Sequence, residues 1–139
     1  MKNENVARES AHRGTWRPLR IGFDTALARL PEALGAEGFG VITQIDLQQT
    51  FKAKLGTDFR RYRIFGACNP NFALEALKTD PRVGLLLPCN VVLYERDDGV
   101  AMLGVIDPLQ QLGPAGHGLD DVARVIAEKL TRVFEKLDA

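Results

Sequence analysis

The chain has 139 residues, 45% of them hydrophobic, and its 18 basic and 18 acidic residues give a formal net charge of zero. This size and composition fit one domain that buries its own core, and they exclude a disordered chain. Non-specific binding of nucleic acids needs a surplus of Lys and Arg, so the balanced charge predicts no nucleic-acid partner.

The sequence predicts a polar N-terminal tail over residues 1–15 and a single α+β domain over residues 16–139. The tail lacks the apolar segment of a secretory signal. The longest apolar run is broken by Pro88, far short of a membrane span, so no membrane association is expected. Cys68 and Cys89 are too few for a disulfide framework. We therefore expect free thiols and a cytoplasmic location.

Residues 16–23 predict a short strand, which Pro18 restricts to a sheet edge. A helix should follow, with Asp24 as its N-cap and leucines at helical spacing. Pro31 removes a backbone hydrogen bond inside this helix, so it should kink the helix or delay its start.

Apolar and other residues alternate over 39–45, which predicts the next strand. Asp46 and Gln49 have the spacing of a capping box, and they predict a short helix that ends at Gly56. A second strong strand is expected over residues 59–67.

Asn69 followed by Pro70 predicts a helix start, because proline suits the first helical position and the residue before proline avoids helical geometry. Residues 88–90 then interrupt an apolar stretch that resumes over 91–96. A proline at that place predicts an edge strand or a β-bulge.

Asp98 and Gly99 predict a hairpin leading into a strand over residues 100–106. The clearest helical stripe of the chain covers residues 119–137. The elements together predict about five strands in a mainly antiparallel α+β sheet, with helices packed on one face.

Four motifs occur in a recognisable order: GFGVITQID (38–46), KLGTDF (54–59), FGACNP (65–70) and GLLLPCNVVLYE (84–95). Together with Asp107-Pro108, they resemble domain-of-unknown-function family 302, from about Asp24 to the C-terminus. The resemblance implies a β-α-β-β-β-β-α arrangement like that of the TATA-binding protein, and a homodimer. It implies no activity, and a shared fold is no warrant for DNA binding. Pro31 and the glycine-rich stretch around His117 depart from the family pattern.

Cys68 precedes the predicted helix start, where a helix dipole can lower a thiol pKa and activate it as a nucleophile. It can equally be a small buried hydrophobic residue. Cys89 lies at the predicted bulge, a feature enriched beside active sites, although the bulge can also simply bend the strand. If these strand ends meet, Cys68, Asn69, Cys89 and Asn90 would converge as ligand-binding candidates.

No metal site is predicted, because His12 and His117 lie at no recognised ligand spacing. The common phosphate-binding and nucleophile-elbow motifs are also missing, so neither a cofactor nor an activity can be named. The preferred hypothesis is a homodimeric module that binds a small ligand near Cys68-Asn69 and Cys89-Asn90. Two alternatives stay open: a thiol enzyme or redox sensor that uses Cys68, and a protein-interaction module without a small-molecule site.

Overall fold

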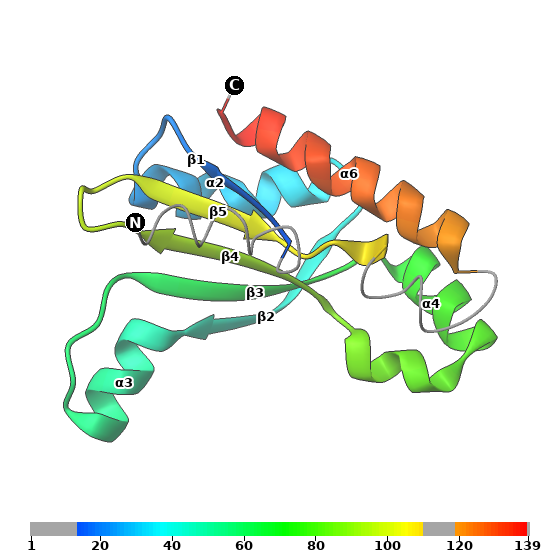
Figure 1. Ribbon diagram of the computed structural model, residues 1–139, viewed down its shortest axis with the longest axis horizontal. Coiled ribbons are helices and arrows are strands. Elements are labelled where there is room, and N and C mark those ends of the chain that lie inside the picture. The colour runs from blue at the N-terminus through cyan, green and yellow to red at the C-terminus, as the bar shows by residue number, and fades with distance from the viewer. Residues whose placement is uncertain (1–13, 110–118, 139) are drawn as a thin grey trace.

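A computed structural model describes residues 14–109 and 119–138 of the chain, so the tail with His12 and the loop with His117 lie outside the described residues. Figure 1 shows a twisted sheet with helices packed beside it. In chain order the elements are β1 (Thr15–Pro18), α2 (Phe23–Gly35), β2 (Gly40–Asp46), α3 (Leu47–Leu55), β3 (Tyr62–Cys68), α4 (Pro70–Thr79), the 3-10 helix η2 (Pro81–Leu86), β4 (Cys89–Glu95), β5 (Ala101–Val105) and α6 (Asp120–Asp138).

The five strands form one sheet in the order β1-β5-β4-β3-β2, and each neighbouring pair is antiparallel. Helix α2 contacts α6, β2 and β4, and α4 contacts α6. The predicted α+β class with a five-stranded antiparallel sheet is confirmed. β1 begins at Thr15, one residue inside the predicted tail.

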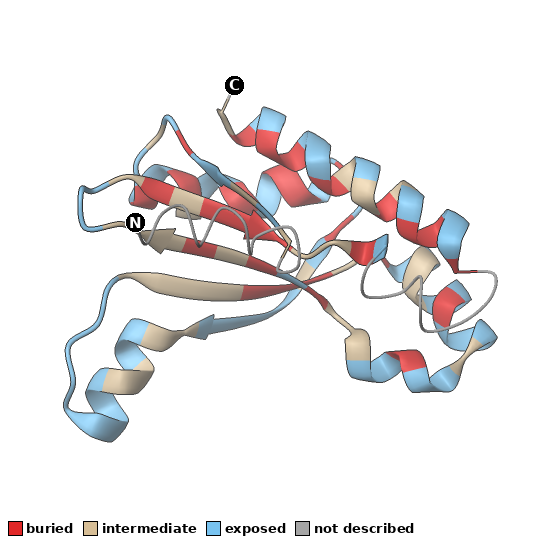
Figure 2. Ribbon diagram, in the orientation of Figure 1, coloured by how far each residue is buried: buried red, intermediate tan, exposed pale blue. Residues whose placement is uncertain are grey.

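The core lies between the sheet and the long helices, where Figure 2 shows buried residues on facing sides of α6, α2 and the central strands. Alternate residues of β4, such as Val91 and Leu93, are fully buried together with Leu30 of α2 and Leu130 of α6. This alternation is what a strand with one covered face requires. The hydrophobic periodicity in the sequence therefore predicts correctly which side of these elements is buried in the core.

The first strand and helix differ from the sequence prediction. β1 ends at Pro18, well before residue 23, and α2 begins at Phe23 with Gly22 as its N-cap. Asp24 lies in the first turn instead, where it pairs with Arg61. The helix runs through Pro31 without a delayed start, because its buried leucine face holds it against the core.

The predicted bulge at residues 88–90 was wrong. Pro88 follows a cis peptide bond and precedes β4, which begins at Cys89 and pairs in regular register with β3. A proline outside the strand leaves the backbone ladder intact, so β4 can occupy the centre of the sheet. The register shift lies elsewhere, between Val41 and Thr43 of the edge strand β2.

Strand β2 and helix α3 form an arm that projects from the body of the molecule (Figure 1). The predicted cap is confirmed, because the Asp46 carboxylate accepts a hydrogen bond of 3.0 Å from the Gln49 backbone N–H. Gly56 ends the helix in the left-handed conformation, as predicted. No residue of α3 is buried, so packing against its own chain covers little of this helix.

Candidate functional site

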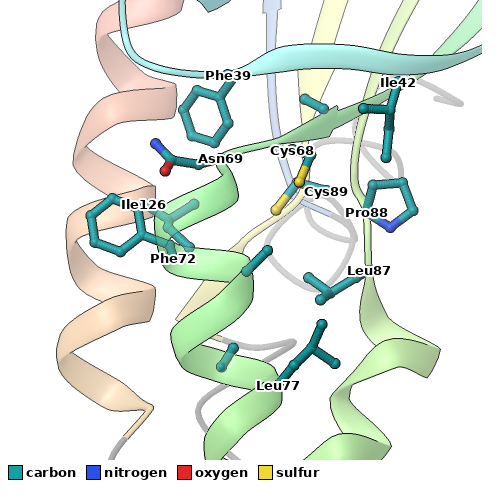
Figure 3. Close-up of a pocket in the computed structure, with 13 residues that line it drawn as sticks. Phe39, Ile42, Cys68, Asn69, Phe72, Leu77, Leu87, Pro88, Cys89 and Ile126 are labelled. Carbon is teal, nitrogen blue, oxygen red and sulfur yellow. The ribbon is translucent and has the colours of Figure 1, made fainter.

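An apolar pocket of about 260 Å³ lies where the end of β3, the start of β4 and one flank of α4 meet. Its wall comes from residues far apart in the sequence. They are Phe39, Ile42, Ala67, Cys68, Asn69, Phe72, Ala73, Ala76, Leu77, Leu87, Pro88, Cys89 and Ile126 (Figure 3).

The sheet register explains why Cys68 and Cys89 meet at this pocket. Cys89 pairs directly with Ala67, the residue before Cys68, so the two cysteines are neighbours across adjacent strands. Figure 3 shows their sulfur atoms close together. Both are free; Cys68 is half-buried, whereas Cys89 is buried.

Burial raises the pKa of the Cys89 thiol to about 11, and the neighbouring Cys68 adds to this rise. An apolar environment disfavours the thiolate, and a second thiolate nearby disfavours it further. Cys89 is therefore a neutral thiol near pH 7. Cys68 is the more accessible of the two sulfur atoms.

Asn69 precedes α4 as the predicted N-cap, with Pro70 at the start of the helix. Its backbone carbonyl accepts a 2.9 Å hydrogen bond from the Ala73 N–H, but its side chain makes no capping bond. Only 9% of the residue is exposed. The side-chain amide is thus held at the pocket wall without its usual local role.

Asn90 lies away from the other three candidates. It is paired with Gly66 in the sheet, is exposed, and is not among the residues around the pocket. Successive side chains of a strand point to opposite faces, so Cys89 and Asn90 cannot line the same side of β4. The expected convergence holds for Cys68, Asn69 and Cys89, whose role in binding stays a prediction.

Sequence reasoning missed most of the pocket, above all the flank of α4 formed by Phe72, Ala73, Ala76 and Leu77. A signal was present in the composition of this helix. It carries more apolar residues than one buried face needs, and Leu74 and Leu77 are 57% and 38% exposed. Surplus apolar surface of this kind is typical of a binding surface.

A larger hollow of about 580 Å³ lies beside α2 and the end of α6. Arg29, Glu32 and Lys136 contribute to its wall, which makes it a polar surface groove. Among the described residues, no group of three or more His, Cys, Asp or Glu side chains could hold a metal ion. None of the described helices has the length and apolarity needed to cross a membrane.

The fold and pocket place the chain among small α+β domains with one antiparallel sheet, and comparison with known proteins identifies the family. The family model described as "Domain of unknown function DUF302" matches residues 17–137, so the chain belongs to this family. The resemblance noted from the motifs is confirmed.

Two relatives support the assignment. The crystal structure of an uncharacterized conserved DUF302 protein from Bacillus stearothermophilus has a TM-score of 0.81 and 29% identity, over 88% of this chain and 96% of that chain. An uncharacterized protein from Aquifex aeolicus (strain VF5) is 26% identical over 87 residues, which is 63% of this chain. The match spans about half, 54%, of that relative's length.

Proposed function

We propose that this chain is a homodimeric module that binds a small molecule in the pocket beside α4. The observation that carries the proposal is the pocket itself, in which an almost wholly apolar wall includes one amide, from Asn69, and two thiols. Small-molecule sites typically combine an apolar lining with a few polar groups that orient the ligand. The cavity is also large enough, because a dry cavity of roughly 150 Å³ already admits benzene.

Binding can be tested with three apolar probes, toluene, indole and cyclohexanol, by ligand-observed NMR on the native protein. A variant, Ala73→Leu, would fill part of the pocket from α4 and should weaken probe binding at least tenfold. Ala28→Leu, on an exposed position of α2, is the matched control and should leave binding unchanged. Absence of binding for every probe, or equal binding by Ala73→Leu, would contradict the proposal.

A thiol-dependent role is the second candidate, favoured by the two cysteines that share this pocket. Hydrogen peroxide would oxidise the Cys68 thiol to a sulfenic acid, with release of water. The Cys89 thiol would then displace the sulfenic hydroxyl, forming a disulfide and a second water. Mass spectrometry after peroxide treatment should detect a product lighter by two hydrogens, absent from Cys68→Ser and Cys89→Ser; without that product this candidate fails.

The homodimer is supported by the exposed edge of the sheet at β2. Ile42 and Ile45 of this strand are 60% and 46% exposed, and Leu55 of α3 is 71% exposed. An open strand edge with apolar side chains is a template for pairing with another strand. A second copy paired antiparallel along β2 would extend the sheet and cover part of the arm. The same exposed edge also fits the alternative of a protein-interaction module without a small-molecule site.

A further inference from the structure

One polar side chain of the pocket has no hydrogen-bond partner among the described residues. The Asn69 amide makes no capping bond, although only 9% of the residue is exposed. Every fully enclosed side-chain N or O atom of the described residues has a hydrogen-bond partner, so the unpartnered amide atoms of Asn69 are not fully enclosed. Asn69 is part of the pocket wall, and Figure 3 shows its amide between the rings of Phe39 and Phe72.

Gly38 leaves room for the Asn69 amide. A Cβ atom at Gly38 would lie 2.9 Å from the Asn69 Nδ2 atom, closer than real Cβ contacts. Gly38 also has a positive φ of 86°, which a side chain would make costly. The backbone at Gly38 thus allows the amide to occupy this place at the edge of the pocket.

The described part of the wall offers no charged partner to an ion. No Lys, Arg, Asp, Glu or His is among the described residues that line the pocket, and Cys89 is a neutral thiol. Helix α4 contributes the side chains of Phe72, Ala73 and Ala76 to the wall, and none of the three carries a polar atom. An ion in this pocket would lose its hydration without gaining an oppositely charged side chain among the described residues, which is strongly unfavourable.

The volume limits the size of the ligand. A cavity of roughly 150 Å³ admits benzene, which has six non-hydrogen atoms. In proportion, the 260 Å³ pocket holds a ligand of about ten non-hydrogen atoms. An amide side chain both donates and accepts hydrogen bonds, and it can therefore bind an amide, a carbonyl or a hydroxyl group.

We propose that the pocket takes an uncharged ligand of about ten non-hydrogen atoms, with an apolar body and one neutral polar group that hydrogen-bonds to Asn69. The proposal rests on the proposed binding function and names its ligand class. It excludes carboxylates and phosphates of the same size.

The test compares octanamide with octanoate, which have the same number of non-hydrogen atoms and differ in charge, with toluene as a purely apolar probe. Calorimetry on the wild-type chain at pH 7.5 should show octanamide binding at least tenfold more tightly than octanoate. If neutral octanoic acid is the form that binds, the apparent affinity of octanoate should rise about tenfold for each unit of pH lowered from 8 to 6. The affinity for octanamide should stay constant over the same range.

The role of Asn69 is tested by Asn69→Leu, which preserves the size of the side chain and removes its polar atoms. Octanamide binding should weaken by about five- to tenfold, the usual effect of one lost hydrogen bond, while toluene binding is retained. Retained toluene binding shows that the variant is folded. If this variant does not fold, Asn69→Ser, which removes the amide and keeps a small polar side chain, takes its place in the test of the hydrogen bond. The pH comparison on the wild-type chain tests the ligand class independently of either variant.

Three outcomes separate the two proposals. Octanoate binding as tightly as octanamide at pH 7.5 would overturn the ligand class and leave the binding function standing. Equal octanamide binding by wild type and folded Asn69→Leu would overturn the role of Asn69 and its hydrogen bond. Failure of octanamide, octanoate and toluene alike would overturn the binding function and the ligand class together.

Discussion

The Arg132 Nε atom of α6 donates a hydrogen bond of 2.8 Å to the Oε1 atom of Glu37, a residue just beyond the end of α2. The two residues are 95 positions apart in the chain. The Glu37 side chain is almost completely buried, and Lys136 lies 3.6 Å from its second oxygen. This contact ties the C-terminal helix to the end of the helix beside it.

The pair should make stability depend on pH. Burial by itself raises the pKa of Glu37, but the Arg132 hydrogen bond and the charges of Arg132, Lys136 and Lys129 outweigh it and hold the pKa below its ordinary value of 4.5. The pair therefore adds its full contribution to the free energy of unfolding at pH values above the unfolded-state pKa of Glu37. This contribution is lost as the pH falls through the lower folded-state pKa of Glu37. Urea unfolding of wild type and Glu37→Gln between pH 3 and 7 measures this difference.

At pH 7 we expect Glu37→Gln to lower the free energy of unfolding by about 1 kcal/mol, because a neutral amide replaces the carboxylate beside two cations. The difference from wild type should shrink toward pH 3. Asp121→Asn, which removes the exposed pair with Arg124, is the control and should change stability by less than about 0.5 kcal/mol. If the difference in stability between Glu37→Gln and wild type is the same at every pH, the pKa of Glu37 is not lowered by folding and the prediction is wrong.

A side chain at Gly104 should disturb the packing of Trp16 on the sheet. Gly104 is paired with Trp16, and a Cβ there would lie 2.4 Å from an atom of the indole ring. Trp16 in turn packs edge-on against Tyr94, with ring centroids 5.8 Å apart. Gly104→Ala should therefore cost about 1–3 kcal/mol and shift the tryptophan fluorescence.

Gly40→Ala is the matched control for that substitution, because it is also in a strand and its added Cβ would have no neighbour within 4 Å. We expect little change in its denaturation midpoint. Equal effects from the two alanines would mean that loss of glycine flexibility, and not contact with Trp16, explains the result.

The two thiols should differ in reactivity toward iodoacetamide. With its pKa raised to about 11, Cys89 should stay unmodified in the native protein at pH 7–9, whereas the half-buried Cys68 reacts first. Mass spectrometry of Cys68→Ser and Cys89→Ser assigns each rate separately. Modification of Cys89 at the rate of an unfolded control at pH 8 would show that the pocket is open to solvent.

The proposed dimer should depend on the edge strand. Ile45→Lys would place a charge on the exposed side of β2, where it would be desolvated in an interface between two copies. Analytical ultracentrifugation should show a dimer for wild type and a monomer for this variant, with unchanged circular dichroism. Leu85→Lys is the control, because Leu85 is 92% exposed on η2 and should leave the dimer intact.

Much of the fold was predictable from local patterns. The cap formed by Asp46, the helix start at Asn69-Pro70 and the hairpin at Asp98-Gly99 are encoded by neighbouring residues, and all three are observed. The errors occur where contacts between residues far apart in the chain determine the boundaries of an element. Asp24 does not cap α2, because the helix already begins at Phe23, and Asp24 pairs with Arg61 from the first turn. Pro88 causes no bulge, because β4 begins after it.

The sequence by itself determined the α+β class, the antiparallel sheet and the two cysteines next to strand ends, because hydrophobic period and turn chemistry act over a few residues. The tertiary structure decided that Cys68, Asn69 and Cys89 share one pocket and that Asn90 does not. Strand register and the packing of α4 set those positions, and both depend on contacts between residues far apart in the chain. The same long-range packing left the Asn69 amide with no described hydrogen-bond partner, which no local pattern could indicate.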